Sequence, residues 1–362
     1  MDSMWKFRIL KDRQTGIFNY LINWRSPMPN IVTHYLCGLE AIKNIENEKC
    51  RVLIKKHQNV FNLGVQGPDI LFYYGLWPWS GKVEAKNIGQ DMHISKVNLI
   101  FKGFIDYIIK QNEYVKNILT VYLMGFLCHN CMDSISHPYI FYRSGFKTAT
   151  DPNDNLYIYY HRRFETSIDV LLCKMFLNKK IHEIRPDKFI KITDTEQNII
   201  SAMYESVIKT VFKSNVPKKK VFKAIKDMTF VEKLFRDKHG IKKKIIAFID
   251  NLIYGFPLFS SIIFPHKVTD GLDYLNLKKE EWCLPFDKNK KSNLSFIELF
   301  NEAYKRTQKF CDVLYSSIFS DNANIPYALK LFGNNSYTTG IDCDVPANFK
   351  YHDIIFNEKH KK

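Results

Sequence analysis

The densest group of possible metal ligands lies in the segment LCHNCMDSISHP, residues 127–138. His129, Asp133 and His137 are each four residues apart, so at about 100° per residue they return to nearly the same face of a helix. Imidazole and carboxylate groups are common zinc ligands, and a helix that presents them one turn apart can serve one ion or bridge two. The spacing therefore predicts a metal-binding helix.

More candidate ligands lie on both sides of this segment. His161 and Glu165 again share one helix face, and His34, Asp69 and His93 precede the segment. Burying so many ionisable groups in an apolar helical core without a metal would be costly. The residues therefore predict a metal site better than they predict a set of unrelated core histidines. The ordered set of ligands is His34, Asp69, His93, His129, Asp133, His137, His161 and Glu165.

This order of ligands resembles that of the zinc-dependent phospholipase C family, whose all-helical fold and metal centre are shared with P1/S1-type nucleases. The phrases QGPD at 66–69, FYY at 72–74 and GQDMH at 89–93 also look like the family. The resemblance covers roughly residues 30–170, with weaker echoes in WCLP at 282–285, in SF at 295–296 and in SYTTG at 336–340.

The resemblance implies a ligand set for each ion. Asp69, His93 and His129 would bind one zinc, with Asp133 shared between it and a second, and His34 would join Asp133 on the third. Another zinc would be held by His137, His161 and Glu165. In secreted family members an N-terminal Trp completes the third zinc. Because 33 residues precede His34, neither Trp5 nor Trp24 is identified as that residue. Two or three zinc ions are therefore expected, with the third held by another group, held weakly, or absent.

The chemistry that suits such a centre is hydrolysis of a phosphodiester by a metal-activated water. By resemblance, Asp69 is both a ligand and a catalytic general base for that water. The resemblance implies a phospholipid substrate cleaved on the glycerol side of the phosphate, and Glu165, in place of Asp, favours this branch. Two alternatives stay open: a P1/S1-like nuclease with the same metals, and a non-catalytic protein in which zinc only staples helices and the basic surface binds a membrane or partner.

The loop LWPWSGK, residues 76–82, lies between Asp69 and His93. Trp77 and Trp79 could bind substrate there, because aromatic faces near the metal would stack on a quaternary ammonium or a base. The alternative is that both rings only pack the loop against the protein and contact no substrate.

The composition limits the class of protein. The chain has 362 residues, 46% of them hydrophobic, which excludes wholesale disorder and fibrous architectures. Its net charge of +16 favours anionic partners: a phospholipid or other phosphoester, an anionic membrane touched peripherally, or nucleic acid as the alternative substrate. Eight scattered cysteines and an N-terminus without an apolar signal predict reduced thiols and a cytoplasmic protein.

Apolar residues at three- and four-residue spacing predict an all-α fold. We expect one compact helical domain over 1–362, with a zinc-binding catalytic core at 30–180 and a helical extension at 181–362. Ser295 and Glu298 form a capping-box pattern at the start of a helix over 295–319, and Pro138 is expected to end the helix of His137. The most apolar stretch, 245–264, is interrupted by polar residues, Gly and Pro, so no transmembrane segment is expected. A buried helix with an adjoining loop is favoured there over a membrane-surface element. The other predicted helices span 31–47, 94–112, 117–137, 158–178, 193–213 and 243–254.

Overall fold

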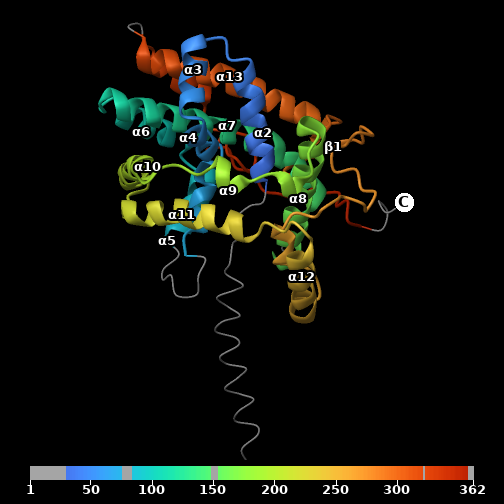
Figure 1. Cartoon of the computed structure of the whole chain (residues 1–362). Helices are drawn as coiled ribbons and strands as arrows, with labels where there is room; N and C mark the ends of the chain where they lie inside the picture. Colours follow the sequence, from blue (N-terminus) through green and yellow to red (C-terminus); the bar gives the residue numbers. More distant parts are fainter. Residues whose placement is uncertain (1–29, 76–83, 148–153, 321–322, 358–362) are drawn as a thin grey trace, which may run out of the picture.

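Helices form nearly all of the regular structure in the computed structural model (Figure 1), which describes residues 30–75, 84–147, 154–320 and 323–357. The all-α prediction is confirmed. Trp77 and Trp79 lie outside the described residues, so their expected role in substrate binding stays a prediction, and Trp5 and Trp24 lie outside them too.

The first half of the chain supplies the helices that carry the predicted ligands. The ligand-bearing elements are α2 (Ile31–Lys43), the 3-10 helix η1 (Gly67–Tyr73), α5 (Glu84–Ile94), α7 (Glu113–Ser144) and α8 (Asp154–Leu177). Helices α3 (Glu48–Lys56), α4 (Gln58–Gly64) and α6 (Val97–Ile108) lie between them in the sequence and carry no predicted ligand.

The second half packs around them. Its elements are η2 (Ile181–Glu183), α9 (Pro186–Phe189), α10 (Asp194–Val207), the π-helical turn η3 (Ile208–Phe212), α11 (Lys218–Leu234), α12 (Ile241–Tyr254), η4 (Ser260–Ile262), α13 (Phe296–Phe319) and α14 (Ile325–Phe332). The strands β1 (Trp282–Leu284) and β2 (Asp287–Ser292) form an antiparallel pair in which Trp282 faces Ser292.

Helix α7 is the centre of the fold. It packs most extensively against α13 and α4, and it also contacts α2, α8 and α10 (Figure 1). Among the described helices, α7 is the one long and apolar enough to cross a membrane, but 94% of its most apolar window is buried inside the protein. Its apolar residues thus belong to the core cluster of the protein.

The expected end of this helix at Pro138 is wrong, because α7 continues through Pro138 to Ser144. Proline has no N–H to offer the carbonyl of Ser134, so the helix needs other contacts to pass this point. They come from Gly340, where φ is +72° and where a Cβ would lie 2.2 Å from the Ser134 oxygen and 3.3 Å from the Pro138 ring. Backbone from far along the chain therefore covers the break.

The expectation of a buried helix within 245–264 is also wrong. Helix α12 forms, but among its residues only Asp250 is buried, and six of its large apolar side chains face solvent. Hydrophobicity indicated burial, yet α12 extends beyond α11 at the lower edge of the molecule (Figure 1), where η4 packs against its polar side and the apolar side stays exposed.

Local capping explains another difference between the predicted and the observed helix ends. The helix expected over 31–47 ends at Lys43, and Asn47 then caps α3 by accepting a hydrogen bond from the Cys50 amide. The capping box of Ser295 and Glu298 is confirmed at the start of α13. Cys128 and Cys131 are buried and free, like most of the cysteines, as expected for thiols that act as small apolar side chains.

Candidate metal centre

Five helical elements bring all eight predicted ligands into three buried groups. The ligand atoms within each group lie within 4.8 Å of one another. The groups are Asp69, His93 and His129; His34, His129 and Asp133; and His137, His161 and Glu165. His129 belongs to two groups, and α7 contributes to all three.

The first group joins η1, α5 and α7. His93 Nε2 lies 2.9 Å from Asp69 Oδ1. The Nδ1 atoms of His93 and His129 lie 2.7 Å from the Gly89 carbonyl oxygen and 3.1 Å from that of Val65. Since a backbone carbonyl can only accept, each Nδ1 carries the proton, and each Nε2 is left with its lone pair toward the centre.

Gly67 lets this group form. Its φ is +51°, and a Cβ at this position would lie 2.3 Å from Cδ2 of His129. Glycine is therefore required at this position, because the turn before Asp69 passes directly over the His129 ring.

The second group is built around the Asp133 carboxylate. Its Oδ1 lies 3.2 Å from His34 Nε2, and its Oδ2 lies 3.1 Å from His129 Nε2 and 3.8 Å from His137 Nδ1. Burial alone would raise the pKa of Asp133, but attraction to the three histidines holds it well below its usual value. Asp133 thus stays ionised between the groups, as a bridging ligand must.

The third group joins α7 to α8. Glu165 Oε1 lies 3.5 Å from His137 Nε2 and 3.3 Å from His161 Nε2. Burial opposes ionisation of Glu165, yet the two histidines lower its pKa to about 2. In turn, Asp133 and Glu165 outweigh burial and raise the pKa of His137 to about 9, so this part of the core attracts positive charge.

The donor atoms fit zinc, because many of them are buried with no hydrogen-bond partner in the described protein. They are His34 Nδ1, Asp69 Oδ1, His93 Nε2, His129 Nε2, Asp133 Oδ1, both ring nitrogens of His161 and both carboxylate oxygens of Glu165. Leaving such groups unpaired costs about 1–3 kcal/mol each, and more for charged ones. Nitrogen and carboxylate oxygen are the donors that zinc takes, so bound zinc would satisfy most of these atoms, with one nitrogen from each imidazole.

Comparison with known proteins agrees with this geometry. The family model of zinc dependent phospholipase C matches residues 33–215, about half of the chain. The chain belongs to this family. Searches of curated proteins and of solved structures give no match. Membership in the family supports a zinc-dependent phosphodiesterase-like function, and the three clusters fit zinc binding.

In this zinc-dependent phospholipase C family member, support for the ligands also comes from outside the matched region. The Tyr337 carbonyl lies 2.8 Å from His137 Nδ1, and the Tyr337 amide donates to the His93 carbonyl. The sequence resemblance included SYTTG at 336–340, but spacing alone gave this segment no role. Its role is to orient two ligands that lie on different helices.

Asp169 is a supporting residue that sequence reasoning missed. It lies four residues after Glu165 on α8, and it accepts hydrogen bonds from the Val32 amide, the Thr33 amide and the Thr33 hydroxyl, at 3.2, 2.7 and 2.6 Å. Burial raises the pKa of Asp169 to about 7 despite these bonds. Because Asn30 provides no side-chain cap, Asp169 holds the first turn of α2 and so places His34. The repeat His161, Glu165, Asp169 at four-residue spacing was the available signal.

A cavity of about 400 Å³ opens onto the first and third groups. His93, His137 and His161 form part of its wall, and most of the rest is apolar, with Arg162 and Lys147 as cations. The apolar lining includes Phe72, Ile94, Phe141, Phe146, Tyr157 and Ile158. Its volume is in the range of small-molecule sites.

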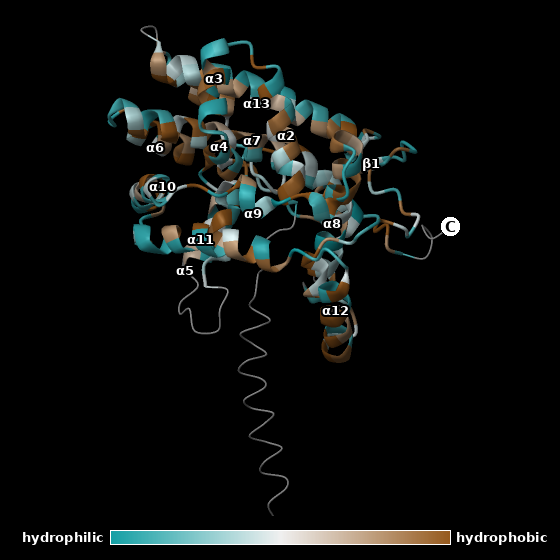
Figure 2. Cartoon of the chain, viewed as in Figure 1, coloured by the Kyte–Doolittle hydropathy of each residue, from teal (hydrophilic) through white to brown (hydrophobic). Residues whose placement is uncertain are grey.

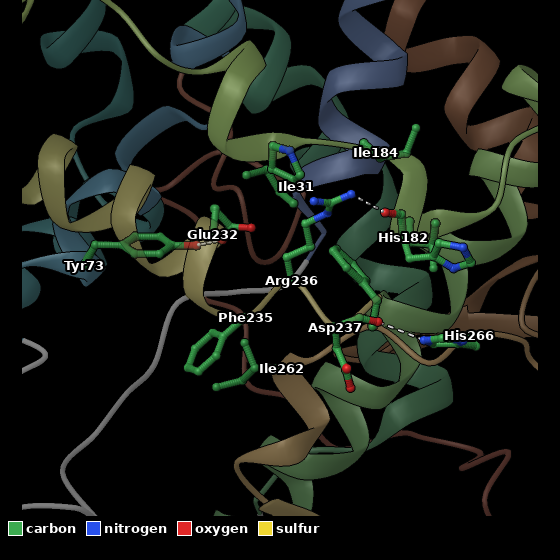
Figure 3. Close-up of a pocket in the computed structure, with 13 residues that line it drawn as sticks. Ile31, Tyr73, His182, Ile184, Glu232, Phe235, Arg236, Asp237, Ile262 and His266 are labelled. Carbon is green, nitrogen blue, oxygen red and sulfur yellow. Dashed lines mark hydrogen bonds between the residues drawn. The ribbon is translucent and has the colours of Figure 1, made fainter. Parts of the chain in front are cut away.

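A second cavity lies elsewhere, between α11 and the starts of α2 and η2 (Figure 3), and measures only about 30 Å³. Its polar groups pair mostly with one another: Tyr73 donates to Glu232, and Arg236 lies 3.5 Å from the His182 carbonyl (Figure 3). It has room for about one water molecule and touches no predicted ligand, so the larger cavity is the candidate substrate site.

Proposed function

We propose that the protein is a zinc-dependent phosphodiester hydrolase whose substrate is a phospholipid. The observation that carries the proposal is the composition of the larger cavity, which joins three ligand histidines to a mostly apolar wall. A glycerophospholipid presents the same combination, a phosphodiester beside acyl chains. A nucleic acid would instead require an open, strongly basic groove with stacked aromatic rings.

The three ligand groups would hold the zinc, two or three ions in all. Zinc, when bound, would lower the pKa of a bound water and offset the charge that develops on the phosphoryl oxygens. The carboxylates of Asp69, Asp133 and Glu165 would offset the positive charge of the zinc ions, so that neighbouring ions repel one another less. Asp69 Oδ1 lies 2.9 Å from His93 Nε2 and accepts no hydrogen bond from the described residues, so it would be free to accept a proton from the attacking water.

Arg162 supplies a fixed cation for the phosphate. It is buried in the wall of the cavity next to His161, and Nη1 lies 3.4 Å from the Leu258 carbonyl. Burial lowers the pKa of Arg162 to about 10, which still leaves the guanidinium charged at neutral pH. A guanidinium held in this way would bind the substrate phosphate and help to orient it.

The test is a pair of assays on the purified, zinc-loaded chain, with phosphatidylcholine micelles in one and single-stranded nucleic acid in the other. We expect release of diacylglycerol, loss of activity under chelation, and at least one zinc per chain by elemental analysis. Arg162→Gln should raise KM for the lipid by about tenfold, because a charge-assisted contact to phosphate is lost.

Three outcomes would overturn the proposal. Cleavage of nucleic acid alone would favour the nuclease. Less than one zinc per chain with full activity under chelation would remove the metal mechanism. If Asp69→Asn keeps its fold and zinc, and neither it nor the unaltered chain hydrolyses any phosphoester, the zinc is structural.

A further inference from the structure

Helix α12 reverses the usual arrangement of a surface helix. Its inward side carries Asp250, which is 2% exposed and accepts a hydrogen bond from the Ser260 amide at 2.7 Å. On the same side, Lys243 Nζ donates to the carbonyls of Ser260 and Ile263. Surface helices normally bury their apolar stripe and expose their polar one. Here polar contacts attach the helix to the protein, and the apolar stripe is left outside.

The exposed stripe is continuous. Phe248 and Leu252 are 66% and 72% exposed, and the whole set is Ile241, Ile245, Phe248, Ile249, Leu252 and Ile253. The first five lie at i, i+4, i+7, i+8 and i+11, which is one side of a helix. Figure 2 shows hydrophobic residues in the lower part of α12, below the body of the molecule. An exposed patch of this kind usually marks an interaction site.

The charges around the stripe indicate the partner. Lys238 and Lys244 are exposed at the start of the helix, Lys267 is exposed in the segment after η4, and the sole acidic residue in α12 is the buried Asp250. An apolar stripe with lysines and without exposed carboxylates is complementary to an anionic bilayer, where the apolar side chains enter the interface and the ammonium groups meet the lipid phosphates.

The position of α12 gives a second reason. The loop after α12 packs on the turn of α8 that lines the larger cavity: the Phe256 ring lies 5.7 Å from the Tyr159 ring, and Arg162, in the cavity wall, lies 3.4 Å from the Leu258 carbonyl. The apolar stripe is therefore connected, through one loop, to the wall of the candidate substrate site.

We propose that α12 is the membrane-docking element of this protein and binds the surface of an anionic lipid bilayer. The choice of a bilayer rests in part on the proposed function, since a phospholipase must reach lipid in a membrane. The binding itself needs no turnover, so the two proposals can be tested apart.

The test measures binding of the zinc-loaded full chain to vesicles and turnover of a soluble substrate. Flotation with vesicles of phosphatidylcholine, with and without about 30% phosphatidylglycerol, reports binding. The anionic lipid gives the vesicle a negative surface potential like that of a cytoplasmic leaflet. Hydrolysis of monomeric short-chain phosphatidylcholine reports the active site alone. The variant is Phe248→Glu with Leu252→Glu, and the matched control is Val52→Glu with Leu99→Glu, two exposed apolar residues on α3 and α6.

We expect the α12 variant to bind anionic vesicles about a hundredfold more weakly, because two large side chains no longer enter the interface. Its turnover of the soluble substrate and its thermal unfolding should be unchanged, and the control pair should bind like the unaltered chain. Replacing Lys238 and Lys244 with Gln should weaken binding about tenfold and reduce its dependence on salt.

Equal binding by the α12 variant and the unaltered chain would overturn the proposal, and so would equal binding of the unaltered chain to neutral and anionic vesicles. A dimer in light scattering that the α12 variant converts to a monomer, with vesicle binding unchanged, would assign the stripe to a second copy of the chain. If the chain binds vesicles through α12 but hydrolyses no phospholipid, the docking proposal stands and the proposed function fails.

Discussion

Helices α7 and α12 depart from the usual distribution of polar and apolar residues in opposite ways. Helix α7 is the most apolar long helix described, yet it carries His129, Asp133 and His137 in its buried interior. Helix α12 is shorter, and six large apolar side chains on it face solvent while Asp250 is buried. The buried polar side chains of α7 face further candidate ligands from four other elements, so their partners lie within the fold. In α12 the exposed apolar surface has no covering element among the described residues.

The difference shows how each departure is stabilised. Buried polar groups must be satisfied where they lie, so α7 implies a ligand inside the molecule, and zinc fits it. Exposed apolar groups can be covered from outside, so α12 implies a partner. Substitutions that act on one helix and spare the other test this distinction.

The largest effect is expected from Asp133→Asn. The change keeps the shape of the side chain but removes the charge that faces three histidines. Zinc content should fall by at least one ion per chain and phosphoesterase activity by more than about a hundredfold, since even residues behind the metal ligands often contribute that much. Elemental analysis and the lipid assay measure both.

Asp250→Asn is the matched control, because Asp250 is an equally buried aspartate on α12 that accepts a backbone hydrogen bond instead of facing histidines. It should lower stability and leave zinc content unchanged. Equal loss of zinc in both variants would contradict the assignment of the ligands to α7.

The next effect concerns how α2 is held. Asp169→Ala leaves two amides and one hydroxyl at the start of α2 without their acceptor. Unfolding in denaturant should show a loss of about 3–4 kcal/mol, from about 1 kcal/mol or more for each donor. Zinc should also bind more weakly, because His34 is displaced. Asp169→Asn keeps one acceptor oxygen and should lose about half as much stability. An unchanged free energy of unfolding and full zinc affinity in the Ala variant would contradict the positioning role.

Two glycines allow a matched test of crowding at the centre. Gly67→Ala places a methyl group against the His129 ring, whereas Gly255→Ala, at the end of α12, has nothing within 4 Å, and both residues have positive φ. We expect losses of about 2–3 kcal/mol and about 1 kcal/mol, because only the first adds a clash to the backbone strain. Thermal unfolding measures the difference, and only Gly67→Ala should weaken zinc binding. Equal losses would show that His129 yields to the methyl group.

The smallest effect contrasts two carboxylates. Unlike Asp133, Glu232 faces a neutral partner, the Tyr73 hydroxyl at 2.8 Å, with the carboxylates of Asp169 and Asp187 nearby. Burial, the largest cause, and these carboxylates raise the pKa of Glu232 to about 7. The folded protein then holds a proton that the unfolded chain has released, so stability falls as pH rises from about 4.5 to about 7.

Glu232→Gln should remove this part of the pH dependence and stabilise the protein above pH 7 by about 1–2 kcal/mol, a value reduced for partial exposure to solvent. Denaturant unfolding of both proteins at several values between about pH 5 and 8 gives the difference. A constant difference across that range would contradict the raised pKa.

The sequence predicted which candidate ligands come together better than it predicted where helices end and which helix is buried. Four-residue spacing on α7 and α8 indicated which side chains share a face, and the structure brings all eight together. Pro138 misled because a local rule for proline cannot anticipate that Gly340 approaches from about 200 residues away. The stretch 245–264 misled because hydrophobicity does not say which partner covers it. The expected division at residue 180 stays a prediction, although Tyr337 supports a ligand from beyond it.

By itself, the sequence determined the helical class and the capping of α13 and supplied the candidate ligands, because periodicity and residue chemistry are local properties. The tertiary structure decided how those ligands divide into three groups, which backbone carbonyls fix the histidine tautomers, and that Asp169 holds α2. It also decided that the apolar stripe of α12 faces outward. These features depend on contacts between segments distant in the chain, and such contacts leave no period in the sequence.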